Sequence, residues 1–215
     1  MSVKDILSQM KIAVVDDHDL IREGMNAVLM SYGAGHVDKY STATALISAI
    51  DTGLLYDFYI IDLELPDIGG FVLIEKIRAR MPEANIIVST IHDEIWTLRR
   101  LLSKNVNAIV YKSGDGREIV FAIEEILQGR RYYCDEVMKT LKMAEDNSAH
   151  PSTRELEVLQ YIALGKTSRE IAAIMFVSDN TVEAHRKALF AKLGAVNVAD
   201  LIMKAINKGY LKKGI

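Results

Sequence analysis

The sequence has little cysteine and proline and no long hydrophobic run. One cysteine, Cys134, among 215 residues excludes an internal disulfide and a zinc site built from several cysteines. The longest apolar run, Ile171–Val177, has seven residues, whereas a membrane helix needs about 20. The opening MSVKDILSQMK mixes charged and apolar side chains and lacks the hydrophobic segment of a secretory signal. These absences predict a soluble, cytoplasmic protein without a membrane segment.

The remaining composition is that of a globular protein, with 50% hydrophobic and 26% charged residues. Disordered and fibrous classes are therefore excluded, and the length allows one large or two small domains. Charge is divided unevenly along the chain. Residues 150–215 carry 10 basic and 6 acidic side chains, a net of +4, whereas residues 1–149 carry 16 and 23, a net of −7. This division predicts two modules with different partners, of which the basic one is a candidate for binding nucleic acid.

Short apolar runs alternate with amphipathic segments over the first 130 residues. Continuous Ile/Val runs are typical of strands buried on both faces of a parallel sheet. The pattern predicts a five-stranded, doubly wound α/β sheet with helices on both faces. The expected strands are Lys11–Asp16, His36–Ser41, Phe58–Asp62, Asn85–Thr90 and Ala108–Lys112. The expected helices are Leu20–Ser31, Ala43–Thr52, Phe71–Arg80, Glu94–Ser103 and Arg117–Leu127.

The rest of the chain is predicted to be helical. A helical stretch at Asp135–Met143 is followed by the polar segment EDNSAH (residues 145–150), which is interpreted as a linker. Two capping boxes, STRE at 152–155 and TSRE at 167–170, open apolar periodic runs. Ser178 and Asn197 are expected to cap two further helices, and Gly194 to end the first of these. The predicted organisation is a domain over 9–130, a linker with a helical segment over 131–149, and a small all-α domain over 150–215.

Polar side chains stand at the carboxyl ends of the predicted strands of the first domain. Asp16 and Asp17 follow the first strand, Asp62 the third, Thr90 the fourth and Lys112 the fifth. In an open parallel sheet these carboxyl ends share one edge, where ligands bind. Carboxylates gathered there are costly unless a cation compensates them. A hard divalent ion such as Mg²⁺, which prefers oxygen ligands, fits this arrangement.

These residues lie in the segments VVDDHDLIREG and IIDLELPDIGG. Together with the strand-ending Thr and Lys, they closely resemble the flavodoxin-like receiver domain of bacterial response regulators, over Met10–Gln128. The resemblance implies that Asp62 accepts a phosphoryl group from a sensor histidine kinase. It also implies that Mg²⁺ is bound by Asp16, Asp17, Asp62 and the backbone carbonyl of Glu64. Lys112 and Thr90 would contact phosphoryl oxygens.

The sequence departs from this family at two positions near the site. Ile109 stands where receivers usually carry an aromatic switch residue, three positions before the lysine. Ser113 follows the lysine where many receivers have proline. Neither change removes a reacting group. The histidines His18, His92 and His185 show no shared metal-ligand spacing.

The predicted helices at Thr167–Met175 and Ser178–Leu193, joined by a short turn, form a helix-turn-helix pattern. Residues expected to lock the two helices together are Ile171, Ile174, Val177, Val182 and Leu189. The segment Ser152–Leu211 resembles the LuxR-type domain of the NarL/FixJ response regulators. The resemblance makes Ser178–Leu193 the recognition helix in the major groove of double-stranded DNA. It implies base-facing positions at Glu183, Ala184 and Lys187, and phosphate contacts from Thr167, Ser168, Thr181, Arg186 and Lys192.

Two features of this domain have more than one interpretation. Glu183 could read a cytosine amino group or could be a solvated helix charge. The apolar stripe of the last helix, Val198–Asn207, could pack onto its own domain. The family resemblance adds a homodimer contact, formed on phosphorylation or on DNA, that pairs two recognition helices.

The function that these patterns indicate is a DNA-binding response regulator controlling transcription, not an enzyme beyond slow loss of its own phosphoryl group. Two alternatives remain. An aspartyl phosphatase would share the nucleophile and the metal, with Glu64 as its acid, but no substrate cap domain is visible. The second alternative is a receiver whose basic tail binds protein. Such a protein would show no salt-dependent binding to duplex DNA.

Overall fold

The computed structural model describes residues 3–145 and 150–211. The chain divides into two compact units: the first falls within residues 1–92 and 101–138, and the second within residues 93–100 and 139–215. Four residues of the predicted linker EDNSAH, 146–149, lie outside the described residues. No helix among the described residues is long and apolar enough to span a bilayer.

The first unit is built on a parallel sheet in the order β2-β1-β3-β4-β5-β6. The strands are β1 (Lys11–Val15), β2 (His36–Tyr40), β3 (Phe58–Ile61), β4 (Asn85–Thr90), β5 (Ala108–Tyr111) and β6 (Tyr132–Tyr133). The predicted doubly wound sheet is confirmed, but the expected number of five strands is wrong. The sixth strand, β6, has two residues and pairs only with Ala108 and Ile109, a segment too short for any periodicity to reveal.

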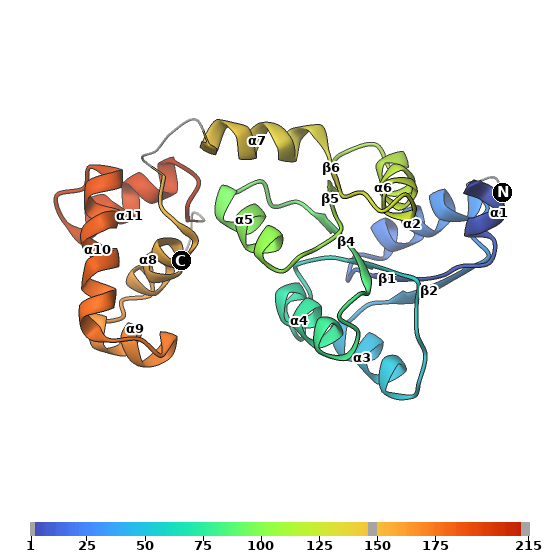
Figure 1. The fold of residues 1–215 in the computed structure, drawn as a ribbon, viewed down its shortest axis with the longest axis horizontal. Coiled ribbons are helices and arrows are strands. Elements are labelled where there is room, and N and C mark those ends of the chain that lie inside the picture. Colours follow the sequence, from blue (N-terminus) through green and yellow to red (C-terminus); the bar gives the residue numbers. More distant parts are fainter. Residues whose placement is uncertain (1–2, 146–149, 212–215) are drawn as a thin grey trace. The chain divides into compact units, whose positions relative to one another are not determined.

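Helices cover both faces of this sheet (Figure 1). One face carries α2 (Asp19–Ser31) and α6 (Arg117–Leu127), and the other carries α3 (Ala43–Asp51) and α4 (Gly70–Arg80). The helix α5 (Ile95–Ser103) joins β4 to β5. The Ile/Val runs of β1, β3, β4 and β5 are almost entirely buried, whereas the edge strand β2 is half exposed. Burial on both faces therefore accounts for the continuous apolar runs in the sequence.

The short helix α1 (Val3–Leu7) was not anticipated from the sequence. Its last residue, Leu7, is buried in the core beneath α2 and α6. Gly35 allows this approach, because a Cβ there would lie 1.9 Å from the backbone oxygen of Ser8. Five residues give too short a window for amphipathic periodicity, so only tertiary packing identifies this helix.

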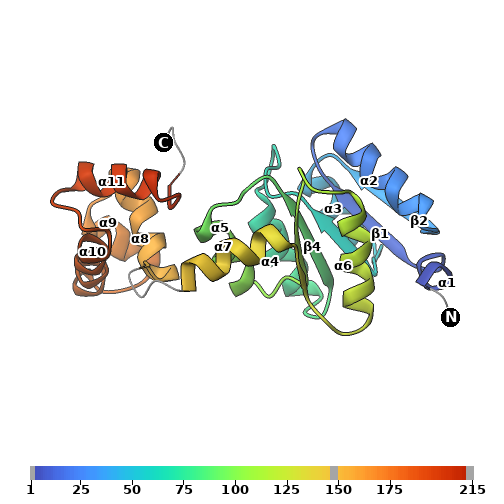
Figure 2. The same cartoon turned by 90° about the horizontal axis from the view of Figure 1, so that it is seen from above.

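The second unit contains the predicted all-helical domain (Figure 2). Its helices are α8 (Thr153–Ala163), α9 (Ser168–Met175), α10 (Asp179–Leu193) and α11 (Val198–Asn207), preceded by α7 (Asp135–Glu145). Both capping boxes form, with Ser152 and Thr167 as N-caps. Ser178 and Asn197 cap α10 and α11, and Gly194 ends α10 in the left-handed conformation. Local sequence signals thus fix the helix ends of this domain.

The predicted set of inward residues was partly wrong. Ile171, Val182 and Leu189 are fully buried between α8, α9 and α10, as expected. Ile174 is 42% exposed and Val177 is 37% exposed. The core-facing stripe of α9 instead contains Ile171 and Ala172. Phe176, with φ of 54°, ends α9 in the left-handed conformation, so the periodicity of the helix does not continue through the turn to Val177.

Candidate functional site

The carboxyl edge of the sheet brings two buried carboxylates to one ammonium group. Asp16 and Asp62 directly follow β1 and β3, and Lys112 follows β5. The Nζ of Lys112 lies 2.7 Å from Oδ2 of Asp16 and 2.7 Å from Oδ2 of Asp62. The side chains of Asp16 and Asp62 are 1% and 2% exposed, and that of Lys112 is 6% exposed. The structure therefore places three residues singled out from the sequence in direct contact.

The charges at this edge do not cancel. Burial raises the pKa of Asp62, helped by the negative charge of Asp16, while the contact with Lys112 opposes the rise. Burial alone would lower the pKa of Lys112, but its bonds to both carboxylates raise it. With Asp17 included, three carboxylates face one ammonium. The two uncompensated negative charges match the charge of a divalent cation.

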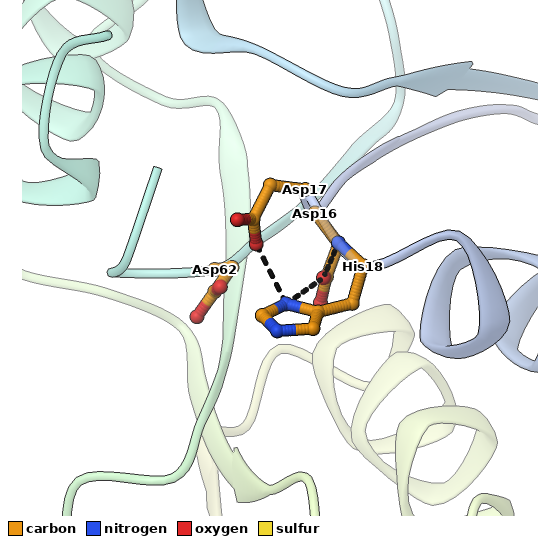
Figure 3. Close-up of side chains that lie close together, drawn as sticks. All are labelled: Asp16, Asp17, His18 and Asp62. Atoms are coloured by element: carbon orange, nitrogen blue, oxygen red, sulfur yellow. Dashed lines mark hydrogen bonds and ion pairs between the residues drawn. The ribbon is translucent and has the colours of Figure 1, made fainter. Parts of the chain in front are cut away.

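Asp17 and His18 complete an acidic group beside Asp16 and Asp62 (Figure 3). Each of the four residues offers one possible ligand atom, and these atoms lie within 4.8 Å of one another. The Nδ1 of His18 lies 2.7 Å from Oδ1 of Asp17 and 3.5 Å from Oδ1 of Asp16. Carboxylate oxygens are the donors that Mg²⁺ prefers, so the donor set is that of an acidic pocket typical of Mg²⁺ binding.

Arg22 supports the loop that carries these residues. Its Nη1 donates a hydrogen bond of 2.6 Å to the backbone oxygen of Asp16, and its guanidinium pairs with Asp19. The backbone N–H of His18 donates to Oδ1 of Asp16 at 2.9 Å. These bonds fix the turn between β1 and α2. Sequence reasoning missed Arg22. It set His18 aside because the histidines share no metal-ligand spacing, although the adjacency of His18 to the aspartate pair was a usable signal.

Thr90 ends the neighbouring strand β4 with its side chain fully buried. Its Oγ1 accepts a hydrogen bond of 3.0 Å from the backbone N–H of His92. The ring of His92 in turn lies beside Glu64, with 3.0 Å between Nε2 and Oε1. This pair connects the loop after β3 to the loop after β4. Thr90 is therefore at the predicted edge of the sheet, where its hydroxyl supports the β4–α5 turn.

The two departures from the receiver pattern, Ile109 and Ser113, do not disturb the local structure. Ile109 is fully buried in β5, paired with Val88 on one side and Tyr133 on the other. The peptide bond between Lys112 and Ser113 is trans, as are the other described peptide bonds.

The predicted base-facing residues share one exposed face of α10. Glu183, Ala184 and Lys187 are all exposed, while Val182 and Leu189 point into the core. The carboxylate of Glu183 accepts a hydrogen bond from Ser168 of α9 and lies 3.8 Å from the Nε of Arg186. Three of the predicted DNA contacts therefore interact with one another.

Other predicted phosphate contacts have structural partners that the sequence did not reveal. The Nζ of Lys192 donates to Oε2 of Glu155 at 2.7 Å, and the side chain of Glu155 is only 8% exposed. This carboxylate also accepts from the backbone N–H of Ser152 in the capping box. Thr181 shares a hydrogen bond of 2.8 Å between its hydroxyl and that of Ser178. Thr167 is exposed at the N-cap of α9.

Comparison with known families matches both units. Residues 12–124 match the response regulator receiver domain, and residues 152–205 match the luxR family of bacterial regulatory proteins. The receiver match alone covers more than half of the chain. The transcriptional regulatory protein MctR of Rhizobium johnstonii is 28% identical over 95% of this chain and 97% of its own length. The oxygen regulatory protein NreC of Staphylococcus aureus is 29% identical over 94% of this chain and all of its own length.

Solved structures agree with these sequence relatives. RcsB from Salmonella enterica serovar Typhimurium, bound to promoter rprA in the presence of the phosphomimetic BeF₃⁻, is 28% identical with a TM-score of 0.66. The match covers 91% of this chain and 98% of that one. A structure of two RcsB dimers bound to two parallel DNAs is 26% identical, also with a TM-score of 0.66, over 93% and 98% of the two chains. With a receiver aspartate site and a LuxR-type helix-turn-helix domain in one chain, the protein belongs to the NarL/FixJ-like DNA-binding response regulators of two-component systems, which are transcription factors and not catalytic enzymes.

Proposed function

We propose that Asp62 accepts a phosphoryl group from the phosphohistidine of a sensor histidine kinase. The observation that carries this assignment is the contact of one buried ammonium, Lys112, with both Asp62 and Asp16. A carboxylate oxygen of Asp62 attacks phosphorus, the bond to the histidine nitrogen breaks, and an acyl phosphate forms. Lys112 then neutralises a phosphoryl oxygen, and the hydroxyl of Thr90 donates a hydrogen bond to another.

Asp16, Asp17, Asp62 and the backbone carbonyl of Glu64 would hold Mg²⁺ in this proposal. The excess of negative charge at the sheet edge and the oxygen donors there support a hard divalent ion. When bound, the ion supplies neutralisation of charge on the incoming phosphoryl oxygens. Removing one anionic donor with Asp17→Asn should weaken Mg²⁺ binding while leaving the fold intact, because Asp17 is partly exposed.

Intact mass spectrometry after treatment with acetyl phosphate and Mg²⁺ tests the phosphorylation site. The parent chain should gain one base-labile phosphate, and Asp62→Ala should gain none. Asp51→Ala is a matched control, because Asp51 is an exposed aspartate of α3 that pairs with Arg80. A phosphate that still forms on Asp62→Ala would overturn the assignment.

We further propose that α10 is the recognition helix and that Glu183, Ala184 and Lys187 face the bases. Their common exposed face supports this orientation. Phosphate contacts are proposed for Thr167, Ser168, Thr181, Arg186 and Lys192. A homodimer formed on phosphorylation or on DNA would place two such helices on two half-sites. RcsB, as dimers on DNA, provides the precedent for this arrangement.

Selection of bound duplexes from a random pool, with and without acetyl phosphate and Mg²⁺, tests DNA binding and its control together. We expect a specific sequence to be enriched, with affinity raised about 5–150-fold by phosphorylation, the usual range of coupling between two sites. Equal affinity and equal oligomeric state in both conditions would contradict the coupling. The proposed domain limits, 9–130 and 150–215 with the 131–149 linker, and a cytoplasmic location are consistent with this function.

A further inference from the structure

We propose that a cavity between α2 and α6 binds a small, uncharged and largely apolar molecule that carries one hydrogen-bonding group. The cavity lies within the first unit, on the sheet face that carries these two helices (Figure 1), and has a volume of about 260 Å³. An engineered apolar cavity of about 150 Å³ binds benzene, so this one has room for a single substituted ring. Its apolar wall is formed by Ile21, Met25, Val28, Val110 and Ile119.

Two exposed glycines line the cavity at its opening. Gly24 stands in the middle of α2, where glycine is less favourable than alanine, yet a Cβ there would have no atom within 4 Å. Its backbone is not left-handed either, so neither close packing nor the backbone conformation requires a glycine. On the other side of the opening, a Cβ at Gly116 would lie 3.2 Å from Cγ2 of Val28. The missing side chain of Gly24 therefore serves to leave the cavity open.

One polar side chain in the cavity has no partner in the part of the chain that the structure describes. Ser89 of β4 lines the cavity and is only 1% exposed. Its hydroxyl takes part in no side-chain hydrogen bond among the described residues. A buried hydroxyl is costly when it lacks a partner. An oxygen of a ligand placed at Ser89 would supply that partner, so the inferred ligand carries one hydrogen-bonding group.

The two charged side chains that line the cavity are already paired. Lys112 contacts Asp16 and Asp62, and Asp115 pairs with Arg117. A further charge inside the cavity would stay uncompensated, which favours an uncharged ligand. Because Lys112 belongs both to the cavity and to the carboxyl edge of the sheet, a bound molecule would adjoin the proposed phosphorylation site. This consequence rests on the proposed function, whereas the binding itself does not.

Titration of the ¹⁵N-labelled, full-length protein with phenol, followed through its amide resonances without Mg²⁺ or a phosphodonor, tests the inference. Toluene is the matched probe, because it has nearly the same shape but carries a methyl group in place of the hydroxyl. Gly24→Leu places a side chain in the cavity. Ala27→Leu is its control, because Ala27 is an exposed residue of α2 that does not line the cavity.

We expect saturable shifts of the amides of Gly24, Ser89 and Val110 when phenol is added to the parent. Gly24→Leu should weaken phenol binding by about tenfold or more, since its side chain takes the volume that the ring needs. Ala27→Leu should change it by less than about twofold, as for most surface changes. Ser89→Ala should reduce the preference for phenol over toluene by about fivefold, the contribution of one neutral hydrogen bond. Thermal unfolding checks that each variant is folded.

Three results would overturn the inference. The first is a set of shifts that do not saturate or that Gly24→Leu leaves unchanged. The second is an equal loss of phenol and toluene binding in Ser89→Ala. The third is a shift of the same amides with protein concentration alone that Gly24→Leu abolishes, which would assign the cavity to a second copy of the chain. None of these results bears on phosphorylation of Asp62, because no metal ion or phosphodonor enters the measurement.

Discussion

The carboxyl edge of the receiver sheet and the exposed face of α10 both carry charged residues assigned to function, but in different surroundings. At the sheet edge, Asp16, Asp62 and Lys112 are buried against one another. On α10, Glu183 and Lys187 are exposed to solvent. A buried charge requires a partner, so its position in the sequence points to a function. A surface charge costs little wherever it stands, so its position is far less informative.

The largest effect should come from Gly70→Ala, which adds a methyl group at the start of α4, against the backbone that follows β3. A Cβ at Gly70 would lie 2.3 Å from the backbone oxygen of Asp62 and 2.7 Å from the Cα of Leu63. We expect a loss of about 3 kcal/mol in the free energy of unfolding, the upper part of the usual overpacking range, together with loss of phosphorylation. Thermal unfolding and intact mass measure the two effects.

Gly69→Ala is the matched control for this prediction, because nothing lies within 4 Å of a Cβ at that position. It should lose only the small amount expected when alanine replaces glycine at an N-cap. Equal behaviour of the two variants would show that the close approach at Gly70 does not shape the site.

The second prediction separates the two lysines of α10, for which the family resemblance implies contact with a base at Lys187 and with a phosphate at Lys192. Lys192→Ala leaves the buried carboxylate of Glu155 without its cation, so we expect about 2 kcal/mol less stability, the cost of an unpaired buried group. Lys187→Ala should leave stability within about 0.5 kcal/mol, as for most surface changes. It should instead cost about 1–3 kcal/mol of binding on the preferred duplex.

Urea unfolding and fluorescence anisotropy with duplex DNA measure these effects. If Lys192→Ala leaves the free energy of unfolding unchanged, Lys192 does not stabilise the fold, and a phosphate contact is its only proposed role. If Lys187→Ala binds its operator and random DNA with the affinities of the parent, this face of α10 does not read the bases.

A third prediction concerns pH. Burial acts to raise the pKa of Glu155, but the ion pair with Lys192 and the hydrogen bonds from Ser152 lower it below its ordinary value of 4.5. A carboxyl group with a lowered pKa in the folded state stabilises the fold above its ordinary pKa, and this contribution is lost as the pH falls through the folded pKa. The protection of the α8 amides from exchange, relative to the intrinsic rate at each pH, should therefore fall below pH 4.5. In Glu155→Gln this fall should be smaller, and an equal fall would assign the effect to other groups.

The smallest effect is expected from Glu183→Ala on the exposed face. The carboxylate repels DNA phosphates and already has partners in Ser168 and Arg186. We expect a uniform gain of at most about 1 kcal/mol in binding to all duplexes, the scale of exposed charges. Binding titrations with matched duplexes measure it. Discrimination lost at a single cytosine would instead show that Glu183 reads a base.

Most secondary structure followed from local signals. The Ile/Val runs of β1, β3, β4 and β5 and the capping boxes at Ser152 and Thr167 correspond closely to the elements found. The five-residue helix α1 and the two-residue strand β6 did not, because they are too short for a periodic pattern and depend on packing. The outward position of Val177 was likewise missed, since the left-handed turn at Phe176 is not encoded by helical spacing. The exposure of Ile174, which precedes that turn, was missed as well.

The sequence by itself determined the order of elements, the helix caps and the arrival of Asp16, Asp17, Asp62, Thr90 and Lys112 at one sheet edge. These depend on local hydrogen bonding and on the fixed direction of parallel strands. Only the tertiary structure decided which side chains meet: Lys112 between Asp16 and Asp62, and Lys192 against Glu155. Such contacts join residues whose spacing in the chain carries no periodic signal, so the folded geometry alone selects them.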